Sequence, residues 1–150
     1  MAAGPTGLSV GTRIPDREVD VRAESMKVFS LLTDDPNPIH WDVAAVRAQG
    51  LGDRPVNQGG LNAGYALQAV TAWAGSPAAL REARVRFLGS VHAGDRVTAG
   101  GEIIEVSPDP SGLRVSVRVW LRTEAGADVV AGSVVVVVAA GREHHLEADS

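Results

Sequence analysis

A carboxylate and an imidazole stand five residues apart in a stiff segment, at Asp35 and His40. From residue 34 to residue 42 the sequence reads Asp-Asp-Pro-Asn-Pro-Ile-His-Trp-Asp. Each proline moves the residue before it, Asp35 or Asn37, out of the helical region, so we expect a rigid, extended loop. Histidine has a reference pKa of about 6.5 and exchanges a proton near neutrality, and a neighbouring carboxylate can orient its ring. The spacing favours a proton-transfer pair, although a capped surface turn would use the same residues.

A second candidate lies at the start of a predicted helix, in the sequence Val56-Asn-Gln-Gly-Gly60. The first amides of a helix have no partner within it, and the helix dipole favours negative charge there. The Gly59 amide could therefore hold a carbonyl oxygen that becomes an oxyanion during a reaction. Glycines at a helix start also serve packing or a turn, so the nearby acid and base are what favour the chemical interpretation.

Metal chemistry is not expected from this sequence. Residues 34 to 42 contain several oxygen ligands, but they lack the glycine at the sixth position and the glutamate at the twelfth position of a calcium loop. The sequence has no cysteine, and His40, His92 and the adjacent His144 and His145 are not spaced to place two zinc ligands on one face. Nucleophile elbows, phosphate loops and dinucleotide-binding glycine patterns are also missing from the sequence.

Length and composition predict one domain over residues 1–150. With 150 residues, a formal charge of −4 and no cysteine, the chain fits a single core in a reducing compartment, and nucleic acid is not the expected partner. No stretch approaches the roughly 18 apolar residues of a membrane span, and the N-terminus lacks the order of a signal peptide. We therefore expect a soluble, cytoplasmic protein. Residues 1–12 and 141–150 are expected to be loosely held.

Hydrophobic periodicity places helices in the first half of the chain. A strand is predicted near Arg17 to Arg22, followed by a helix that begins at Glu24 and Ser25 and ends at the proline loop. Asp42 can cap a short helix that continues through residue 49. From Gly59 to Trp73 the sequence is apolar or small nearly all round, which predicts a helix enclosed in the core and ended by Gly75.

The second half of the chain changes to the period of strands. Four are predicted, at residues 80–91, 95–106, 113–123 and 128–140, joined by turn sequences that favour antiparallel pairing. In the third, Leu113, Val115, Val117, Val119 and Leu121 share one face. The opposite face carries Arg114, Arg118 and Arg122 beside Trp120; it could attract a phosphate-bearing carrier, but a solvated face or a subunit contact explains it equally well. This order predicts an α+β fold in which an antiparallel sheet curls around the long helix.

The segment Asp35-Pro-Asn-Pro-Ile-His40, followed by Asp42, resembles the hydratase motif of the MaoC-like, R-specific enoyl-CoA hydratase and dehydratase family. Gln58-Gly59 falls where that family usually has His-Gly at the start of its central helix. The strand sequence 85–91 and the turn Gly94-Asp95 are also similar to the family. The resemblance covers roughly residues 13–138.

The resemblance implies a hotdog fold, at least a dimer, and a reaction without metal or redox cofactor. It implies that Asp35 and His40 activate water for syn addition to a trans-2-enoyl thioester, or catalyse the reverse elimination from a (3R)-3-hydroxyacyl thioester. It also implies that Asn37 supports the loop and that the Gly59 amide holds the thioester carbonyl. The acyl group would be carried by coenzyme A or an acyl carrier protein.

The chain departs from the family pattern at the helix start. Gln58 replaces the usual histidine, and Gly60 and Asn62 make this end smaller and more polar than the common Met-Leu pattern. Gln58 and Asn62 therefore join Gly59 and Asn37 as candidate substrate-binding residues. Small residues from Gly60 to Ala66 could leave room for an unusual acyl group.

Three other functions remain open on the sequence. A hotdog thioesterase commonly has an acidic residue on the central helix, and residues 59–73 contain none. A noncatalytic or accessory subunit of a heteromeric hydratase is compatible with Gln58 but gives the Asp35 and His40 pair no role. A pathway-specific dehydratase or cyclase of polyketide or sterol-like metabolism would reuse the same pair. The hydro-lyase interpretation accounts for most of the motif.

Overall fold

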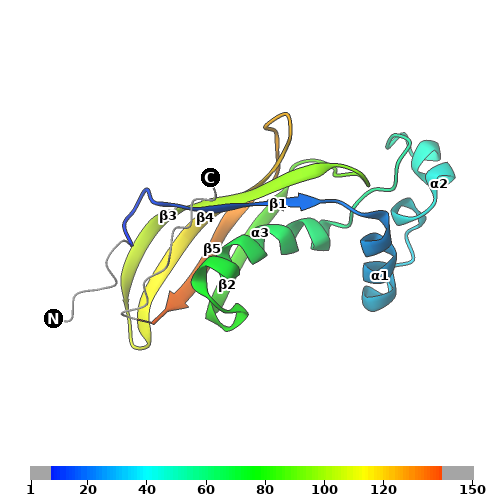
Figure 1. The fold of residues 1–150 in the computed structure, drawn as a ribbon. Coiled ribbons are helices and arrows are strands. Elements are labelled where there is room, and N and C mark those ends of the chain that lie inside the picture. The colour runs from blue at the N-terminus through cyan, green and yellow to red at the C-terminus, as the bar shows by residue number, and fades with distance from the viewer. Residues whose placement is uncertain (1–7, 140–150) are drawn as a thin grey trace.

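One long helix, α3 (Gly59–Ala74), packs against a single five-stranded sheet in the computed structural model, which describes residues 8–139 (Figure 1). The strands are β1 (Arg13–Asp20), β2 (Leu80–Phe87), β3 (Arg96–Asp109), β4 (Gly112–Thr123) and β5 (Asp128–Val138). The other helices are α1 (Ala23–Thr33), α2 (Val43–Ala48) and two single-turn 3-10 helices, η1 (Pro38–His40) and η2 (Pro77–Ala79). This order confirms the predicted α+β class.

The sheet has the order β1-β3-β4-β5-β2, and all neighbouring strands are antiparallel. The turn sequence at residues 107–112 joins β3 to β4, which pair as predicted. The turn sequence at residues 92–95 was expected to join neighbouring strands too, but it connects β2 to β3, and β2 pairs with β5 at the far edge of the sheet. The first strand, in contrast, begins at Arg13 rather than at Arg17. Pro15 interrupts the alternating pattern, but β1 lies at the sheet edge, where a proline is tolerated, and its register with β3 shifts between Ile14 and Arg17.

The predicted inner face of β4 is confirmed, because four of its five apolar residues are at most 1% exposed. Trp120 lies on the opposite face and is nevertheless only 5% exposed. The guanidinium groups of Arg13 and Arg122 lie 4.8 and 4.3 Å from the centre of its ring, and Gly100 on β3 leaves room for the indole. The buried inner residues of β4 are Val115, Val117, Val119 and Leu121.

The arginines on the outer face of β4 are paired with carboxylates of three other strands, β2, β3 and β5. A guanidinium whose charge is balanced by a nearby carboxylate attracts a phosphate less strongly. The arrangement therefore favours surface ion pairs over a binding site for a phosphate-bearing carrier. The three nitrogen–oxygen pairs are Arg114 with Glu82 at 3.8 Å, Arg118 with Glu102 at 3.3 Å and Arg122 with Asp128 at 2.7 Å.

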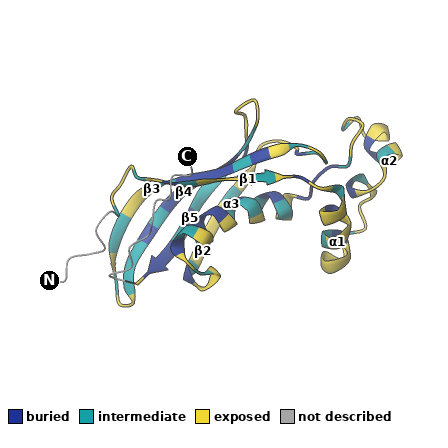
Figure 2. Cartoon of the chain, viewed as in Figure 1, coloured by how far each residue is buried: buried dark blue, intermediate teal, exposed yellow. Residues whose placement is uncertain are grey.

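The sheet covers one side of helix α3 as predicted, but the opposite side, which the sequence placed in the core, is partly exposed. Ala66, Ala69 and Val70 are at most 2% exposed and pack against the sheet, whereas Gly64 and Gln68 are exposed (Figure 2). A sequence of small residues carries no polar stripe to mark the outer face, so periodicity alone could not show this. The helix ends as predicted, because residue 75 is a glycine with a φ of 89°.

The two small helices extend beyond the sheet, next to the N-terminal end of α3 (Figure 1). Helix α1 begins at Ala23 without a side-chain cap, so Glu24 lies in its first turn instead of forming its start. Helix α2 begins as predicted, because Asp42 accepts a hydrogen bond of 2.9 Å from the Ala44 amide. None of the described helices is both long enough and apolar enough to cross a bilayer.

The ends of the chain are described only in part. Within the predicted N-terminal tail, the Gly11 amide donates to the Ile103 carbonyl at 2.8 Å, and the Ile103 amide donates to the Thr12 carbonyl at 2.9 Å. Residues 1–7 and the predicted tail at 141–150, with His144 and His145, lie outside the described residues.

Candidate active site

The proline loop between α1 and α2 is held by its own polar groups. Asp34 adopts a left-handed conformation with a φ of 51° and ends α1. The Asp34 and Asp35 amides both donate to the Ser30 carbonyl, the latter at 3.0 Å. Asp35 then accepts from the Asn37 amide at 3.0 Å, and Asn37 accepts from the Ile39 amide at 3.3 Å. The capped-turn geometry is therefore present, and it fixes the backbone on both sides of Asp35.

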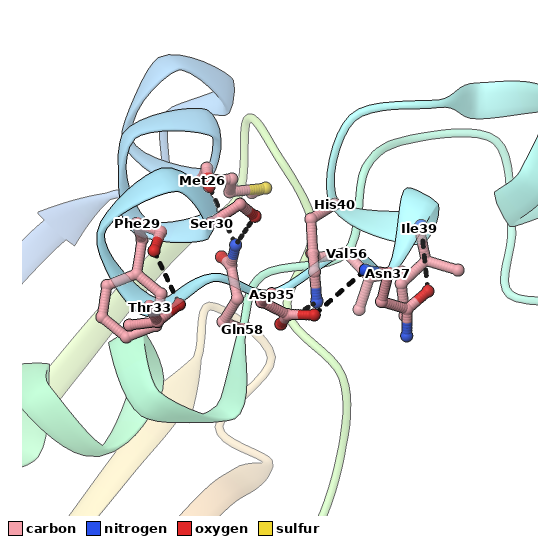
Figure 3. Close-up of polar contacts among 10 residues, drawn as sticks. All are labelled: Met26, Phe29, Ser30, Thr33, Asp35, Asn37, Ile39, His40, Val56 and Gln58. Carbon is pink, nitrogen blue, oxygen red and sulfur yellow. Dashed lines mark hydrogen bonds and ion pairs between the residues drawn. The ribbon is translucent and has the colours of Figure 1, made fainter.

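Asp35 and His40 converge within this loop, as their spacing predicted. The distance from His40 Nε2 to Asp35 Oδ2 is 3.1 Å (Figure 3). The histidine side chain is 8% exposed, whereas the aspartate side chain is 35% exposed. A ligand can therefore approach the pair from the side of the carboxylate.

A backbone carbonyl orients the ring of His40. His40 Nδ1 lies 2.7 Å from the carbonyl oxygen of Val56, and because a carbonyl only accepts, Nδ1 donates this hydrogen bond. Nε2 then faces the Asp35 carboxylate at 3.1 Å, which is within hydrogen-bonding distance. The ring is therefore held with Nε2 toward the acid, an arrangement that suits proton transfer.

The carbonyl that orients His40 is itself fixed by the neighbouring chain. The Val56 amide donates to the Ile39 carbonyl at 2.9 Å, and the Asn57 amide donates to the Val91 carbonyl at 2.7 Å. Val56 also forms an isolated antiparallel bridge with His92. Sequence reasoning did not identify Val56, because it acts through its backbone and any residue type supplies a carbonyl.

A partly exposed ion pair between Arg54 and Asp95 attaches this segment to the start of β3. Arg54 Nη1 donates to Asp95 Oδ1 at 2.8 Å and to the Ala93 carbonyl at 2.7 Å, and the His92 amide donates to Asp95 Oδ2 at 2.9 Å. Partial burial acts to raise the pKa of Asp95, but the hydrogen bond from His92 and the nearby Arg54 outweigh it and bring that pKa below its ordinary value. The ionised form of Asp95 is therefore the one that the fold prefers.

We expect Asp95→Asn to lower the free energy of unfolding by about 1–2 kcal/mol at pH 7, because two charge-assisted hydrogen bonds lose their charge. Since the folded-state pKa lies below the unfolded value of about 3.9, this stabilisation is complete above that value and is lost as the pH falls through the folded-state pKa. Urea unfolding from pH 7 to pH 3 measures the difference. Asp20→Asn is the control, because the exposed Asp20 also has a lowered pKa through its hydrogen bond with Arg96 but supports no loop; equal losses in both variants would contradict the account.

The N-terminal end of α3 presents free amides. Gln58 precedes the helix without a side-chain cap, and the first bond within the helix runs from the Asn62 amide to the Gln58 carbonyl at 3.1 Å. The amides of Gly59, Gly60 and Leu61 come before it and have no acceptor within the helix. The positive end of the helix dipole adds to their attraction for an oxyanion.

Two phenylalanines cover the glycines at this helix end. A Cβ on Gly59 would lie 3.2 Å from the Phe87 ring, and a Cβ on Gly60 would lie 2.8 Å from the Phe29 ring. The room expected beside Gly60 is therefore already occupied by an aromatic ring. A Cβ on Gly64 would meet no atom within 4 Å, so open space begins one turn further along.

The side chains of Gln58 and Asn62 point into the protein. Gln58 Nε2 donates to the Met26 carbonyl and to Ser30 Oγ, both at 2.8 Å, and Asn62 Oδ1 accepts from Asn57 Nδ2 at 2.7 Å (Figure 3 shows the Gln58 contacts). Gln58 and Asn62 are each 3% exposed. Their role as substrate-binding residues remains a prediction, whereas Asn37 and Gly59 have the loop and helix positions that the sequence indicated. Ser30 was missed, although a serine four residues after the buried Met26 is a polar group on the inner face of α1.

A cavity of about 350 Å³ borders Asp35. It lies between α1 and the proline loop and combines apolar with charged side chains, which suits an amphipathic ligand. Its lining residues are Lys27, Ser30, Leu31, Asp34, Asp35, Pro36 and Trp41. Within residues 8–139, no three acidic or histidine side chains gather in a group that could hold a metal ion.

Comparisons with known proteins find solved structures of similar fold. The (R)-hydratase from A. caviae involved in PHA biosynthesis is 25% identical, has a TM-score of 0.78, and is matched over 89% of this chain and 98% of its own. R-Hydratase PhaJ1 from Pseudomonas aeruginosa is 23% identical over 95% and 92% of the two chains, with a TM-score of 0.75. The ChsH1-ChsH2 complex from Mycobacterium tuberculosis contains a chain that is 24% identical over 87% and 98%, with a TM-score of 0.74.

The sequence itself gives a match at the level of the family. Among curated proteins, no relative matched the chain. The family model described as MaoC like domain matches residues 8–119, which is more than half of the chain and contains the proline loop, α3 and most of the sheet. The chain therefore belongs to the MaoC-like domain family and has the hotdog fold of its hydratase and dehydratase relatives.

Proposed function

We propose that this protein is a hydro-lyase that adds water to a trans-2-enoyl thioester or, in reverse, dehydrates a (3R)-3-hydroxyacyl thioester. The observation that carries the proposal is the contact of 3.1 Å between His40 Nε2 and Asp35 Oδ2, in a loop that the hydrogen bond from His40 to the Val56 carbonyl ties to the segment preceding α3. Membership of the MaoC-like family and the similarity to (R)-hydratases support the same reaction class.

The proposed reaction uses Asp35 and His40 as an acid–base pair. The thioester carbonyl accepts a hydrogen bond from the Gly59 amide, which draws electrons toward the carbonyl and makes the β-carbon electrophilic. As the water oxygen bonds to the β-carbon, the Asp35 and His40 pair takes one proton from the water and gives one proton to the α-carbon. Because one pair performs both transfers on one face of the double bond, the addition is syn. The balance is one water consumed and one double bond saturated, with no oxidant or metal.

The composition of α3 favours the proposal of hydration over that of thioester hydrolysis. The helix contains no aspartate or glutamate that could serve as base or nucleophile beside the thioester carbonyl. Coenzyme A or an acyl carrier protein would supply the thioester, and the proposal needs no further cofactor.

We further propose that the protein works as a dimer or larger assembly with a second MaoC-like chain, identical or different. Within residues 8–139 no strand pairs with the outer side of β2, and Phe87 and Leu88 at its end are 57% and 54% exposed. Helix α1 exposes Leu31 and Leu32 by 84% and 80%. Exposed apolar side chains of this size and an unpaired edge favour a protein partner. The related ChsH1-ChsH2 structure is a complex of two chains.

Light scattering on the purified protein is expected to give about twice the chain mass of 15.6 kDa or more. Leu88→Asp should weaken the association by at least about tenfold, because it places a charge at the open edge. Val10→Asp is the matched control, since Val10 is 66% exposed but precedes β1 at the opposite edge. A monomeric parent protein, or equal effects of the two substitutions, would contradict a contact at β2.

The proposed reaction is tested by following the absorbance of enoyl thioesters with short and bulky acyl groups. We expect the parent protein to consume at least one of them. Failure to turn over any enoyl thioester, of coenzyme A or of a carrier protein, would overturn the hydro-lyase proposal and favour an accessory subunit or a cyclase.

A further inference from the structure

Gln58 forms a polar bridge between α1 and α3. The residue lies immediately before Gly59, and its side chain is 3% exposed. Both hydrogens of Nε2 are used on α1, one toward the Met26 carbonyl and one toward Ser30 Oγ, each at 2.8 Å. A surface cavity of about 440 Å³ lies along α1 and is bordered on the α3 side by Leu61. The bridge therefore ties a backbone carbonyl and a side chain of α1 directly to the residue that precedes α3.

Ser30 connects this bridge to the acid of the active site. Its hydroxyl accepts from Gln58, and its carbonyl accepts from the Asp35 amide at 3.0 Å. Two hydrogen bonds and one residue thus join the side chain before Gly59 to the backbone of Asp35. The other half of the pair is tied to the same segment, because His40 bonds the carbonyl of Val56, two residues before Gln58.

We propose that Gln58 is a positioning residue that acts through Ser30 to set where Asp35 lies relative to His40 and to the Gly59 amide. The proposal deepens the hydro-lyase function and rests on it for its effect on rate, while its effect on geometry can be measured without substrate. The short segment 56–59 would then have three roles: the Val56 carbonyl orients His40, Gln58 positions Asp35 through Ser30, and the Gly59 amide supplies the oxyanion contact.

The chemistry of the glutamine side chain explains why it suits this place. One amide nitrogen offers two hydrogens and reaches both acceptors, whereas each ring nitrogen of histidine carries at most one hydrogen. The arrangement has a cost, because Gln58 Oε1 is buried without a hydrogen-bond partner in the described structure. A buried polar contact that costs stability in this way is expected where its geometry positions residues of a functional site.

The test compares Ser30→Ala, Gln58→Met and the double variant with the parent. Ser30→Ala is conservative, because alanine favours the helix and fills almost the same volume. We expect each single substitution to lower kcat by about 10- to 100-fold, since a shift of the acid by about 1 Å is enough for such a loss. KM should stay within about twofold of the parent value. The kcat of the double variant should lie within about threefold of the kcat of the less active single variant.

Thr33→Ala is the matched control on the same helix. Thr33 Oγ1 donates to the Phe29 carbonyl at 2.7 Å, so the substitution removes a side-chain bond of α1 that does not reach α3 (Figure 3). This variant should keep the parent kcat. Losses that multiply in the double variant, or equal losses in Thr33→Ala, would overturn the positioning role.

A second measurement separates failure of this inference from failure of the hydro-lyase proposal. The ¹⁵N resonance of His40 Nε2 reports its contact with Asp35 in the protein without substrate. We expect it to shift in Ser30→Ala and Gln58→Met and to stay unchanged in Thr33→Ala. An unchanged resonance in all three variants overturns the positioning role even in an active protein, whereas an inactive parent with the expected shifts overturns only the hydro-lyase proposal.

Discussion

Replacing His40 by glutamine, or Asp35 by asparagine, is expected to lower kcat for an enoyl thioester by about 10³-fold. Acid–base groups in enzymes contribute about 10² to 10⁴ in rate, and the proposed addition depends on a proton that these two side chains transfer. Each substitution keeps the size of the side chain and removes its ability to exchange that proton. Because His40 is buried and bonded to Val56, stability should be measured alongside rate.

Asp42→Asn is the matched control for the same motif. Asp42 is the last carboxylate of the proline segment and caps α2 by accepting from the Ala44 amide, a role that asparagine fills equally well. Its activity should therefore remain within about twofold of the parent. A parent and an Asp35→Asn variant of equal, measurable activity would show that the pair does not carry the reaction.

The second large effect is expected at Gly59, where one substitution can remove the proposed oxyanion contact alone. Proline is well tolerated at the first position of a helix, and Gln58 has φ and ψ of −64° and 143°, which a following proline accepts. Gly59→Pro deletes the amide hydrogen while leaving the acid and base untouched. We expect kcat to fall by about 10²- to 10³-fold, as for the loss of one oxyanion donor.

Gly59→Ala isolates this loss from the added bulk. Both variants place a Cβ about 3.2 Å from the Phe87 ring, and Phe87 is 57% exposed, so its ring can shift away. Alanine keeps the amide hydrogen, so its kcat should fall by no more than about fivefold. If alanine and proline reduce kcat equally, the Gly59 amide is not the group that holds the carbonyl.

Much of the fold followed from local patterns. The alternation in β4, the small-residue helix α3 and the Asp42 cap each depend on residues close together in sequence, and the structure confirms them. The start of β1 and the open face of α3 did not follow, because they depend on edge position and on which neighbours happen to cover a surface. A proline in an edge strand and a helix without polar residues carry no local signal of either.

The candidate site divides in the same way. The motif identified Asp35 and His40, and the structure places their side chains in contact. Ser30 and the carbonyl of Val56 were not identified, since one lies on another helix and the other is backbone. The direction of the Gln58 side chain was equally beyond the sequence, because it depends on how α1 packs beside α3.

The most direct measurement of the central claim is the product formed from a trans-2-enoyl-CoA in D₂O by the parent protein. The account predicts a (3R)-3-hydroxyacyl thioester that carries one deuterium at the α-carbon, placed by syn addition. It also predicts that the His40→Gln variant forms this product about 10³-fold more slowly. A product of the opposite configuration, anti addition, or hydration that proceeds equally well without His40 would contradict it.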